Sequence, residues 1–424
     1  MGGNRYRLVA LEDIVGTEFV KSDPETISFY TVDGMAPRAV VFPESVEQIS
    51  RLVKLAREEK WALLPWGSGS KIEMGNIPSR LDFVLCTMRL NRIIDMDTAN
   101  LTVTAQAGVR FRDLQTALAG QEDRCYLPYE SPVDLLDQRI CSDREHMGCF
   151  LPMWPPYSDS ATLGGIIASN STGHTRLLYG LPRDMVLGVR YVAPSGEVIG
   201  VGGKTVKNVS GYDMCKLMIG SMGSLGVLCE MTFRLLPLPE RVGTCLSVFP
   251  SLDDASRCVD KIFDSNLLPA AVEILNGHNL GLMAQDEIPA FEADKYAVAV
   301  ALEGVDEAVE RMASEIKEMA TDSGAEESVY LKEKAHGLFW EAFSNFSNRL
   351  SKAYPEITSV RINYPISQYY EVIHLAQSLI RDHQLEYELI SHAGSGMAVI
   401  HFLSNRKEAQ AEDKIVLSVK TLLE

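Results

Sequence analysis

The strongest constraint on this chain is a glycine-rich segment near its middle, residues 202–227. Its glycines stand singly or in one pair, separated by a Lys-Asn and a Tyr-Asp pair, so the segment is not low-complexity sequence. Glycine loses more backbone freedom on folding than any other residue, and it is kept where the backbone must turn or touch something closely. The pattern predicts a backbone packed flat against a large planar ligand.

Two further clusters of glycine and hydroxyl residues precede this segment. Residues 63–70 form an apolar strand pattern that ends in a loop of small residues, and residues 160–173 alternate small apolar residues with glycine, serine and threonine. Successive backbone N–H groups in such a loop can hold a diphosphate. One glycine loop is usually a plain turn. Three in this order predict a cofactor site.

Length and composition are those of an ordinary globular protein. With 424 residues the chain is long enough for two or three domains and a sizeable core. Its 46% hydrophobic and 23% charged residues are typical of folded domains. The formal net charge of −17 argues against a nucleic acid or an anionic membrane surface as partner.

Nothing in the hydropathy pattern indicates a membrane span. No uninterrupted apolar stretch reaches the necessary length, and the first residues lack the apolar core of a signal peptide. We therefore expect a cytoplasmic protein that can reach a membrane only through partner subunits.

The eight cysteines are scattered and include no Cys-x-x-Cys pair. This spacing matches neither a disulfide framework nor a zinc or iron–sulfur ligand set, so no metal site is predicted. The short motif Gly203-Lys204-Thr205 is not a nucleoside-triphosphate loop either, because Val198 stands where that loop needs a glycine.

Short strands and two helices are predicted before residue 240. Ser45 and Gln48 form a capping-box pattern before a helix with an apolar face. No Gly-x-Gly-x-x-Gly follows the strand at 62–64, which argues against a nicotinamide fold. Residues 194–196 mark a hairpin. The expected strands are 39–42, 62–64, 82–86, 92–96, 101–105, 186–193, 197–201 and 227–236, and the second helix is 109–119.

Residues 125–157 are the least regular region, with several prolines and acidic residues. A metal or cluster site built from Cys125, Cys141, Cys149 and His146 is one interpretation. A surface loop that contacts a partner subunit is the favoured one, because the spacing fits no ligand motif.

Beyond Pro237-Leu238-Pro239 the pattern changes to strands alternating with amphipathic helices. Ser251 and Asp254 form the start signal of the first of these helices. The alternation predicts an α+β layer with a mostly antiparallel sheet. The expected strands are 244–249, 296–302, 359–362, 385–390 and 397–402, and the helices are 251–264, 305–319 and 372–380.

The order of the three glycine clusters resembles the FAD-binding domain of the vanillyl-alcohol oxidase and p-cresol methylhydroxylase type. Within that group the chain looks most like the smaller flavin-binding subunit of bacterial glycolate oxidase and D-lactate dehydrogenase complexes. The resemblance implies an α+β protein with an N-terminal extension (1–35), a two-subdomain FAD-binding domain (36–240, insertion about 125–157) and an α+β cap domain with a mostly antiparallel sheet (241–424).

The resemblance also implies which residues hold FAD. The loop at 67–70 would contact the diphosphate, and the later clusters would lie along the cofactor body and its ring or adenine. The first loop contains no histidine, which favours non-covalent FAD, while His174 leaves a covalent link open. The implied FAD contacts are Pro65, Gly67, Ser68, Gly69, Ser70, Ser160, Thr162, Leu163, Gly164, Gly165, Ala168, Gly173, Gly211, Gly223, Gly226 and Val227.

The substrate side departs from the family pattern. Residues 391–401 keep a His-x-Gly-x-Gly skeleton, but no metal-binding His-x-His occurs anywhere in the chain, and Met222 stands where catalytic relatives have Glu. Arg361 could pair with a substrate carboxylate and His392 could act as general base. A surface arginine and an ordinary hydrogen-bonded histidine are the alternatives.

Three functions follow from the resemblance. The first is an FAD subunit that accepts a hydride from a small 2-hydroxyacid, glycolate or D-lactate, and passes electrons to an iron–sulfur subunit, beside a catalytic FAD-binding paralogue. The second is a flavin-stabilised structural or assembly subunit without turnover. The third is a stand-alone oxidase that uses oxygen.

Overall fold

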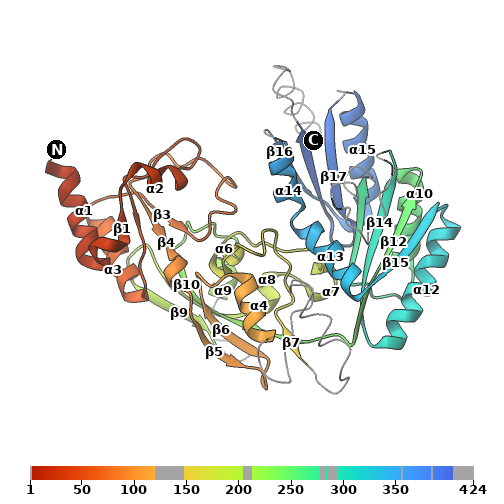
Figure 1. Cartoon of the computed structure of the whole chain (residues 1–424), viewed down its shortest axis with the longest axis horizontal. Helices are drawn as coiled ribbons and strands as arrows, with labels where there is room; N and C mark the ends of the chain where they lie inside the picture. Colours follow the sequence, from red (N-terminus) through yellow and green to blue (C-terminus); the bar gives the residue numbers. More distant parts are fainter. Residues whose placement is uncertain are drawn as a thin grey trace. The chain divides into compact units, whose positions relative to one another are not determined.

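The computed structural model describes residues 2–119, 148–203, 213–276, 283, 292, 294–354, 357–382 and 385–403, with side chains from residue 8 onward. The chain divides into two compact units, whose elements are labelled in Figure 1. Unit 1 comprises Met1–Leu127, His146–Thr172 and Gly180–Leu238, and unit 2 comprises Pro128–Glu145, Gly173–Tyr179 and Pro239–Glu424.

Unit 1 begins with a four-stranded sheet in the order β1-β2-β4-β3, formed by Val20–Lys21, Ala39–Val41, Phe83–Cys86 and Leu63–Trp66. The last three strands are parallel, and helix α3 (Val46–Glu58) connects β2 to β3. The predicted cap of α3 is confirmed, since Ser45 Oγ accepts from the Gln48 N–H. The Gln48 side chain returns to the Glu44 N–H instead of closing the capping box on Ser45.

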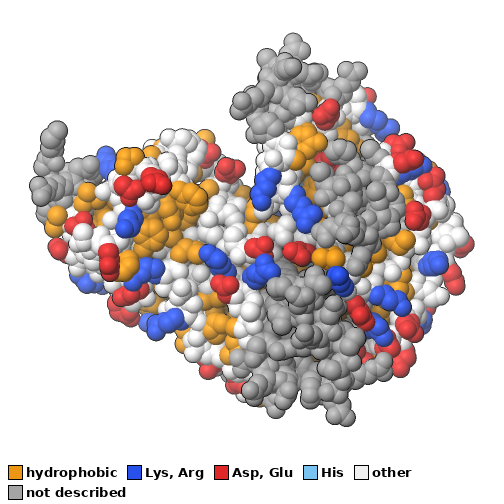
Figure 2. All heavy atoms as spheres, viewed as in Figure 1, with side chains coloured by type: hydrophobic (Ala, Val, Ile, Leu, Met, Phe, Trp, Pro, Cys, Tyr) orange, Lys and Arg blue, Asp and Glu red, His pale blue; other side chains and the backbone are white. Residues whose placement is uncertain are grey.

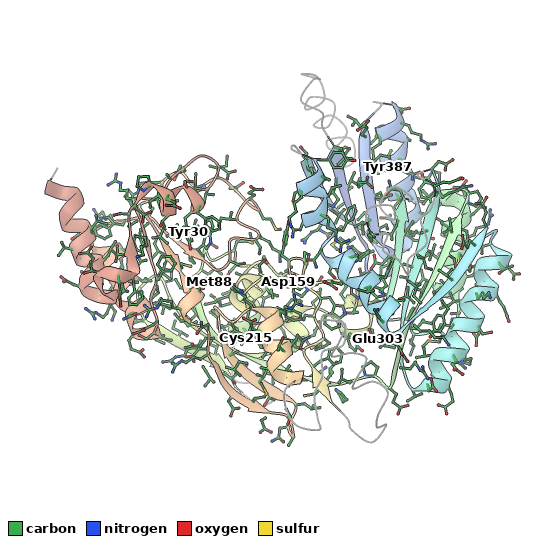
Figure 3. The ribbon with its side chains drawn as sticks, viewed as in Figure 1. Tyr30, Met88, Asp159, Cys215, Glu303 and Tyr387 are labelled. Atoms are coloured by element: carbon green, nitrogen blue, oxygen red, sulfur yellow. The ribbon has the colours of Figure 1, made fainter. Side chains whose placement is uncertain are left out.

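The core of this sheet lies on the side of α3 and helix α1 (Gly2–Val15). The other side carries helix α2 (Pro24–Phe29), after which the Tyr30 ring packs 5.0 Å from the Trp66 ring (Figure 3). Figure 2 shows hydrophobic side chains gathered on this part of unit 1. Phe29, the last residue of α2, is exposed.

A second, antiparallel sheet of unit 1 has the order β5-β6-β10-β8-β9. Strands β8 and β9 form the predicted hairpin, and the short helix α6 (Leu163–Ala168) contacts β6 and β10. Strand β7 (Cys149–Phe150) pairs with β11 (Leu236–Pro237), so the end of the region expected as an insertion is tied to the strand after β10. The strand bounds are Ile93–Asp97, Thr102–Gln106, Val227–Arg234, Val186–Val192 and Val198–Gly202, and the helices nearby are α4 (Phe111–Ala119), α8 (Pro182–Met185) and α9 (Met214–Met218).

Unit 2 is built on a seven-stranded sheet in the order β15-β12-β14-β13-β17-β18-β16, in which every pair is antiparallel. The predicted α+β cap with an antiparallel sheet is confirmed. The strands are β12 (Arg241–Phe249), β13 (Ala271–Asn276), β14 (Tyr296–Gly304), β15 (Glu327–Lys332), β16 (Ile357–Asn363), β17 (Glu386–His392) and β18 (Met397–Leu403).

Each face of this sheet has its own helices and its own hydrophobic core (Figure 1). One face packs against α10 (Leu252–Asp264), α12 (Asp306–Asp322) and α15 (Tyr369–Asp382). The other packs against α13 (Glu333–Ser344) and α14 (Phe346–Ala353), and the short helix α7 (Arg176–Tyr179) contacts β13. Among the helices that the structure describes, none has the length and apolar character needed to cross a membrane.

Candidate functional site

The first predicted loop follows β3 and lies against the second. A Cβ added to Gly67 would overlap the Thr162 hydroxyl oxygen, so the two backbones approach as closely as glycine allows. Gly69 has a φ of +77°, and a Cβ there would lie 2.5 Å from the Trp66 ring. Both positions therefore require glycine for a steric reason.

The second loop leads into α6. Thr162 caps this helix by accepting from the Gly165 N–H at 3.3 Å, and the Gly164 N–H donates to the Ala107 carbonyl at 2.8 Å. A Cβ on Gly164 would lie 2.9 Å from the Ala107 Cβ, which keeps α6 tight against the end of β6. Leu163, in the same turn, is fully buried.

The third loop closes on the other end of α6. The Gly220 N–H donates to the Ile167 carbonyl at 3.0 Å, and the Met222 N–H donates to the Ala168 carbonyl at 2.8 Å. A Cβ on Gly223, which has a φ of +74°, would lie 3.3 Å from Pro65 of β3, just before the first loop. The three loops, far apart in sequence, thus meet along one short helix.

Several polar groups at this meeting point stay without a partner inside the described part of the chain. They include the Ser221 hydroxyl and the side-chain amide oxygen (Oδ1) of Asn170, both of which are buried atoms. Buried polar atoms are nearly always hydrogen-bonded, so such atoms beside three glycine-rich loops fit a ligand with its own donors and acceptors. The residues present therefore fit the diphosphate and polar body of FAD.

The remaining predicted contacts divide between the loops and other places. Ser68 and Ser70 are hydrogen-bonded to each other at 3.3 Å, and Ser160 lies in the turn before Thr162. Val227 begins β10 and is buried, directly after Gly226 with its φ of +153°. Gly173 belongs to unit 2, and Gly211 lies outside the described residues.

His174 also belongs to unit 2, where its ring stacks on Trp340 at 4.0 Å with an interplanar angle of 14°. The side chain is 3% exposed, and burial lowers its pKa well below the usual value. This environment is that of a packed core residue. Of the residues considered for a metal site, Cys149 is buried on β7, whereas Cys125, Cys141 and His146 lie outside the described residues.

His392 lies beside a buried acid in unit 2. Its Nδ1 is 2.9 Å from Oε1 and 2.8 Å from Oε2 of Glu273, which is opposite it on β13. Burial raises the pKa of Glu273, and the nearby His392 and Arg176 oppose that rise. His392 is therefore the partner of a carboxyl group that is 1% exposed.

Arg361 is exposed on β16, within electrostatic range of a second arginine. Burial and then the charge of Arg361 lower the pKa of Arg176, and Glu273 raises it. The Arg176 Nη1 donates to the Met397 sulfur at 3.8 Å, and Met397 pairs with His392 in register. Helix α7 is anchored further by the Tyr179 hydroxyl, which donates to Glu303 near the end of β14 (Figure 3).

Four residues described above were not predicted from the sequence. Lys71 and Ser171 belong to the meeting point of the glycine loops in unit 1, and Glu273 and Arg176 lie near His392 in unit 2. Lys71 follows the first loop directly, and its Nζ donates to Ser171 Oγ. Its position next to Ser70 was the available signal. Glu273 gave a weaker one, as a single acid inside an apolar strand.

Comparison with known proteins agrees with this geometry. The family model of an FAD binding domain matches residues 37–128 and 144–216, and that of the C-terminal domain of FAD linked oxidases matches residues 238–422. The glycolate oxidase subunit GlcD of Bacillus subtilis is 29% identical over 364 residues, which cover 85% of this chain and 72% of the relative. The D-2-hydroxyglutarate dehydrogenase of Xanthomonas citri pv. viticola is 27% identical over 417 residues, which cover 96% of this chain and 82% of the relative.

Solved structures share the fold. Substrate-bound p-cresol methylhydroxylase has a TM-score of 0.73 at 17% identity, covering 100% of this chain and 87% of its own. An alkyldihydroxyacetonephosphate synthase has a TM-score of 0.73 at 18% identity, and the match covers 98% of this chain and 80% of the synthase chain. The chain therefore belongs to the FAD-linked oxidoreductases in which an FAD binding domain precedes the FAD-linked oxidase C-terminal domain.

Proposed function

We propose that this chain is the FAD-carrying subunit of a multi-subunit oxidoreductase that oxidises a small 2-hydroxyacid, glycolate or D-lactate, and passes the electrons to an iron–sulfur subunit. The observation that carries the proposal is the meeting of three side-chain-poor loops along α6. The relatives support the substrate class, since they are named for glycolate, D-lactate and D-2-hydroxyglutarate.

In this proposal the loops hold FAD without a covalent bond. Gly67, Ser68, Gly69 and Ser70 face the diphosphate, and Thr162 with Gly164 and Gly165 follow the cofactor body. When bound, FAD supplies an acceptor that takes two electrons together and releases them singly. The protein supplies binding, orientation and the exclusion of water from the site.

The substrate would be held by unit 2. Arg361 pairs with its carboxylate through two parallel N–H bonds, the geometry that guanidinium favours. His392 takes the proton of the hydroxyl group at Nε2, because Nδ1 faces Glu273. The Glu273 carboxyl group orients the imidazole and stabilises its protonated form.

The test is anaerobic mixing of the purified chain, isolated with its native partners, with glycolate, D-lactate and L-lactate. We expect bleaching of the flavin by one of the first two acids. Arg361→Gln should raise the concentration for half-maximal bleaching about 10- to 100-fold, the range expected for a charged hydrogen bond. Arg311→Gln, which removes a surface arginine of the same unit, is the control. No bleaching by any 2-hydroxyacid, or native protein without an iron-containing partner, contradicts the proposal.

A flavin-stabilised subunit without turnover is the second candidate. It is favoured by the absence of any His-x-His from the sequence and by the packing of His392, whose ring lies 5.8 Å from Phe343. Flavin that binds normally but is not reduced by hydroxyacids in the isolated chain would support it. Oxygen consumption by the isolated chain would instead indicate a stand-alone oxidase.

A further inference from the structure

The side chain of Lys71 connects the first glycine loop to the far end of α6. Its Nζ donates a hydrogen bond to the hydroxyl of Ser171, which is 7% exposed and lies shortly after the last residue of α6. Gly67 contacts Thr162 at the start of the same helix. Residues 67–71 therefore follow the whole length of α6, and Lys71 stands where the third loop joins it.

Within the described part of the chain, no carboxylate lies close enough to Lys71 to balance its charge. Burial alone lowers the pKa of its ammonium group to about 8. Removing an ammonium group from water is unfavourable unless an opposite charge or several hydrogen bonds replace the water. One neutral hydroxyl, that of Ser171, does not meet this requirement.

Polar atoms close to Lys71 also lack the hydrogen-bond partners that buried groups normally have. The side-chain amide oxygen (Oδ1) of Asn170 and the Ser221 hydroxyl are buried without a partner among the described residues. Asn170 and Met222 also hold positive φ angles of 48° and 51°, which non-glycine residues rarely adopt. Strained backbone and unsatisfied polar atoms together are typical of a site completed by a ligand.

We propose that the ammonium group of Lys71 is the counter-charge of the FAD diphosphate, and that Ser171 positions it. The diphosphate is the anionic part of oxidised FAD, and the loop before Lys71 is the one suited to hold it. Lys71 then acts as a cofactor-binding residue outside the glycine motif itself. This inference concerns FAD binding alone, so it does not depend on which substrate the enzyme oxidises.

The test is equilibrium binding of FAD, ADP and riboflavin to the full chain after removal of its cofactor. ADP carries the diphosphate without the flavin, and riboflavin carries the flavin without phosphate. Lys71→Met should weaken FAD and ADP binding about 10- to 100-fold while riboflavin binding stays within about twofold. Lys71→Arg should retain most of the affinity, and Lys21→Met, which removes an exposed charge from β1 of the same unit, should change none of the three.

Unchanged FAD affinity in Lys71→Met, or equal losses for riboflavin and FAD, would overturn the proposal. Folding is checked by thermal unfolding of the cofactor-free protein, in which Lys71→Met should be at least as stable as the parent because a half-buried charge without a counter-charge is gone. Ser171→Ala is a second, milder variant. It should weaken the binding of FAD and ADP about 3- to 10-fold and leave that of riboflavin unchanged. Affinities for FAD and ADP that stay at the values of the parent protein would refute the positioning role of Ser171.

Discussion

Lys71 connects cofactor affinity to pH through a single half-buried amine. Its pKa is lowered from 10.5 to about 8 by burial, with no other titratable group contributing. A bound diphosphate favours the ammonium form and raises that pKa again. Above pH 8, binding of FAD must therefore be accompanied by uptake of a proton.

We expect the affinity for FAD to fall as the pH rises above 8, by up to about tenfold per pH unit. The same titration in Lys71→Met should be flatter, because the variant has no amine to protonate. Fluorescence titration of the cofactor-free protein between pH 7 and 10 measures both curves. Parallel curves for the two proteins would show that another group controls binding.

Glu273 and His392 form the other residue-scale feature, a buried acid whose partner is a single imidazole. A lone buried carboxylate is strongly unfavourable, and the histidine on the adjacent strand provides its hydrogen bond. The two residues are 119 positions apart in sequence. Their pairing follows from strand order, which no local pattern of residues reveals.

Among the secondary-structure elements, those whose apolar residues repeat with a clear helical or strand period were predicted from the sequence. Helices α3 and α10 begin directly after the expected caps, Ser45 and Ser251, because a capping side chain precedes an apolar stripe. Strand β13 was not predicted: both of its faces are buried, so it shows no alternation, and Glu273 interrupts its apolar run.

Helices α6 and α13 were missed for related reasons. Two glycines in the six residues of α6 are typical of a loop, and the helix persists because Thr162 caps it and β6 and β10 support it. Helix α13 carries Gly337 and is buried around much of its circumference, so it has no single apolar stripe. The glycine loops were predictable from composition, whereas the contact between Lys71 and Ser171 spans 100 residues and was not.

The packing of the first loop against α6 predicts that Gly67→Ala abolishes measurable FAD binding or weakens it more than about 100-fold. A methyl group there overlaps the Thr162 hydroxyl, and moving either backbone by the needed amount disrupts the cap of α6. Gly200→Ala on β9 is the matched control, since nothing lies within 4 Å of its added Cβ. Equilibrium dialysis with FAD compares the two. Near-normal binding by Gly67→Ala would mean that the loops do not need to touch.

On the scale of the whole molecule, the two units differ in their histidine content. The described residues of unit 1 contain none, whereas unit 2 buries His174, His336 and His401 in its core. The short excursion Gly173–Tyr179 brings His174 into that core, where it stacks on Trp340. Trp340 in turn donates to Thr244, which also hydrogen-bonds His336. Unit 2 therefore depends on neutral imidazoles in a way that unit 1 does not.

This arrangement predicts that unit 2 unfolds first in mild acid. Burial lowers the pKa of His336 to about 3, that of His401 to about 4 and that of His174 well below 6.5. An unfolded histidine titrates near 6.5, so between about pH 6.5 and 4 the unfolded state binds more protons and stability falls as the pH falls. Each of the three contributes up to about 1.4 kcal/mol per pH unit, against a total stability of about 5–15 kcal/mol for a typical domain.

Urea unfolding followed by near-ultraviolet circular dichroism at pH 7, 6 and 5 should show an unfolding midpoint that drops steeply as the pH falls, and His401→Asn should reduce this dependence on pH. A midpoint that is the same at all three pH values would mean that these histidines are not buried in their neutral form.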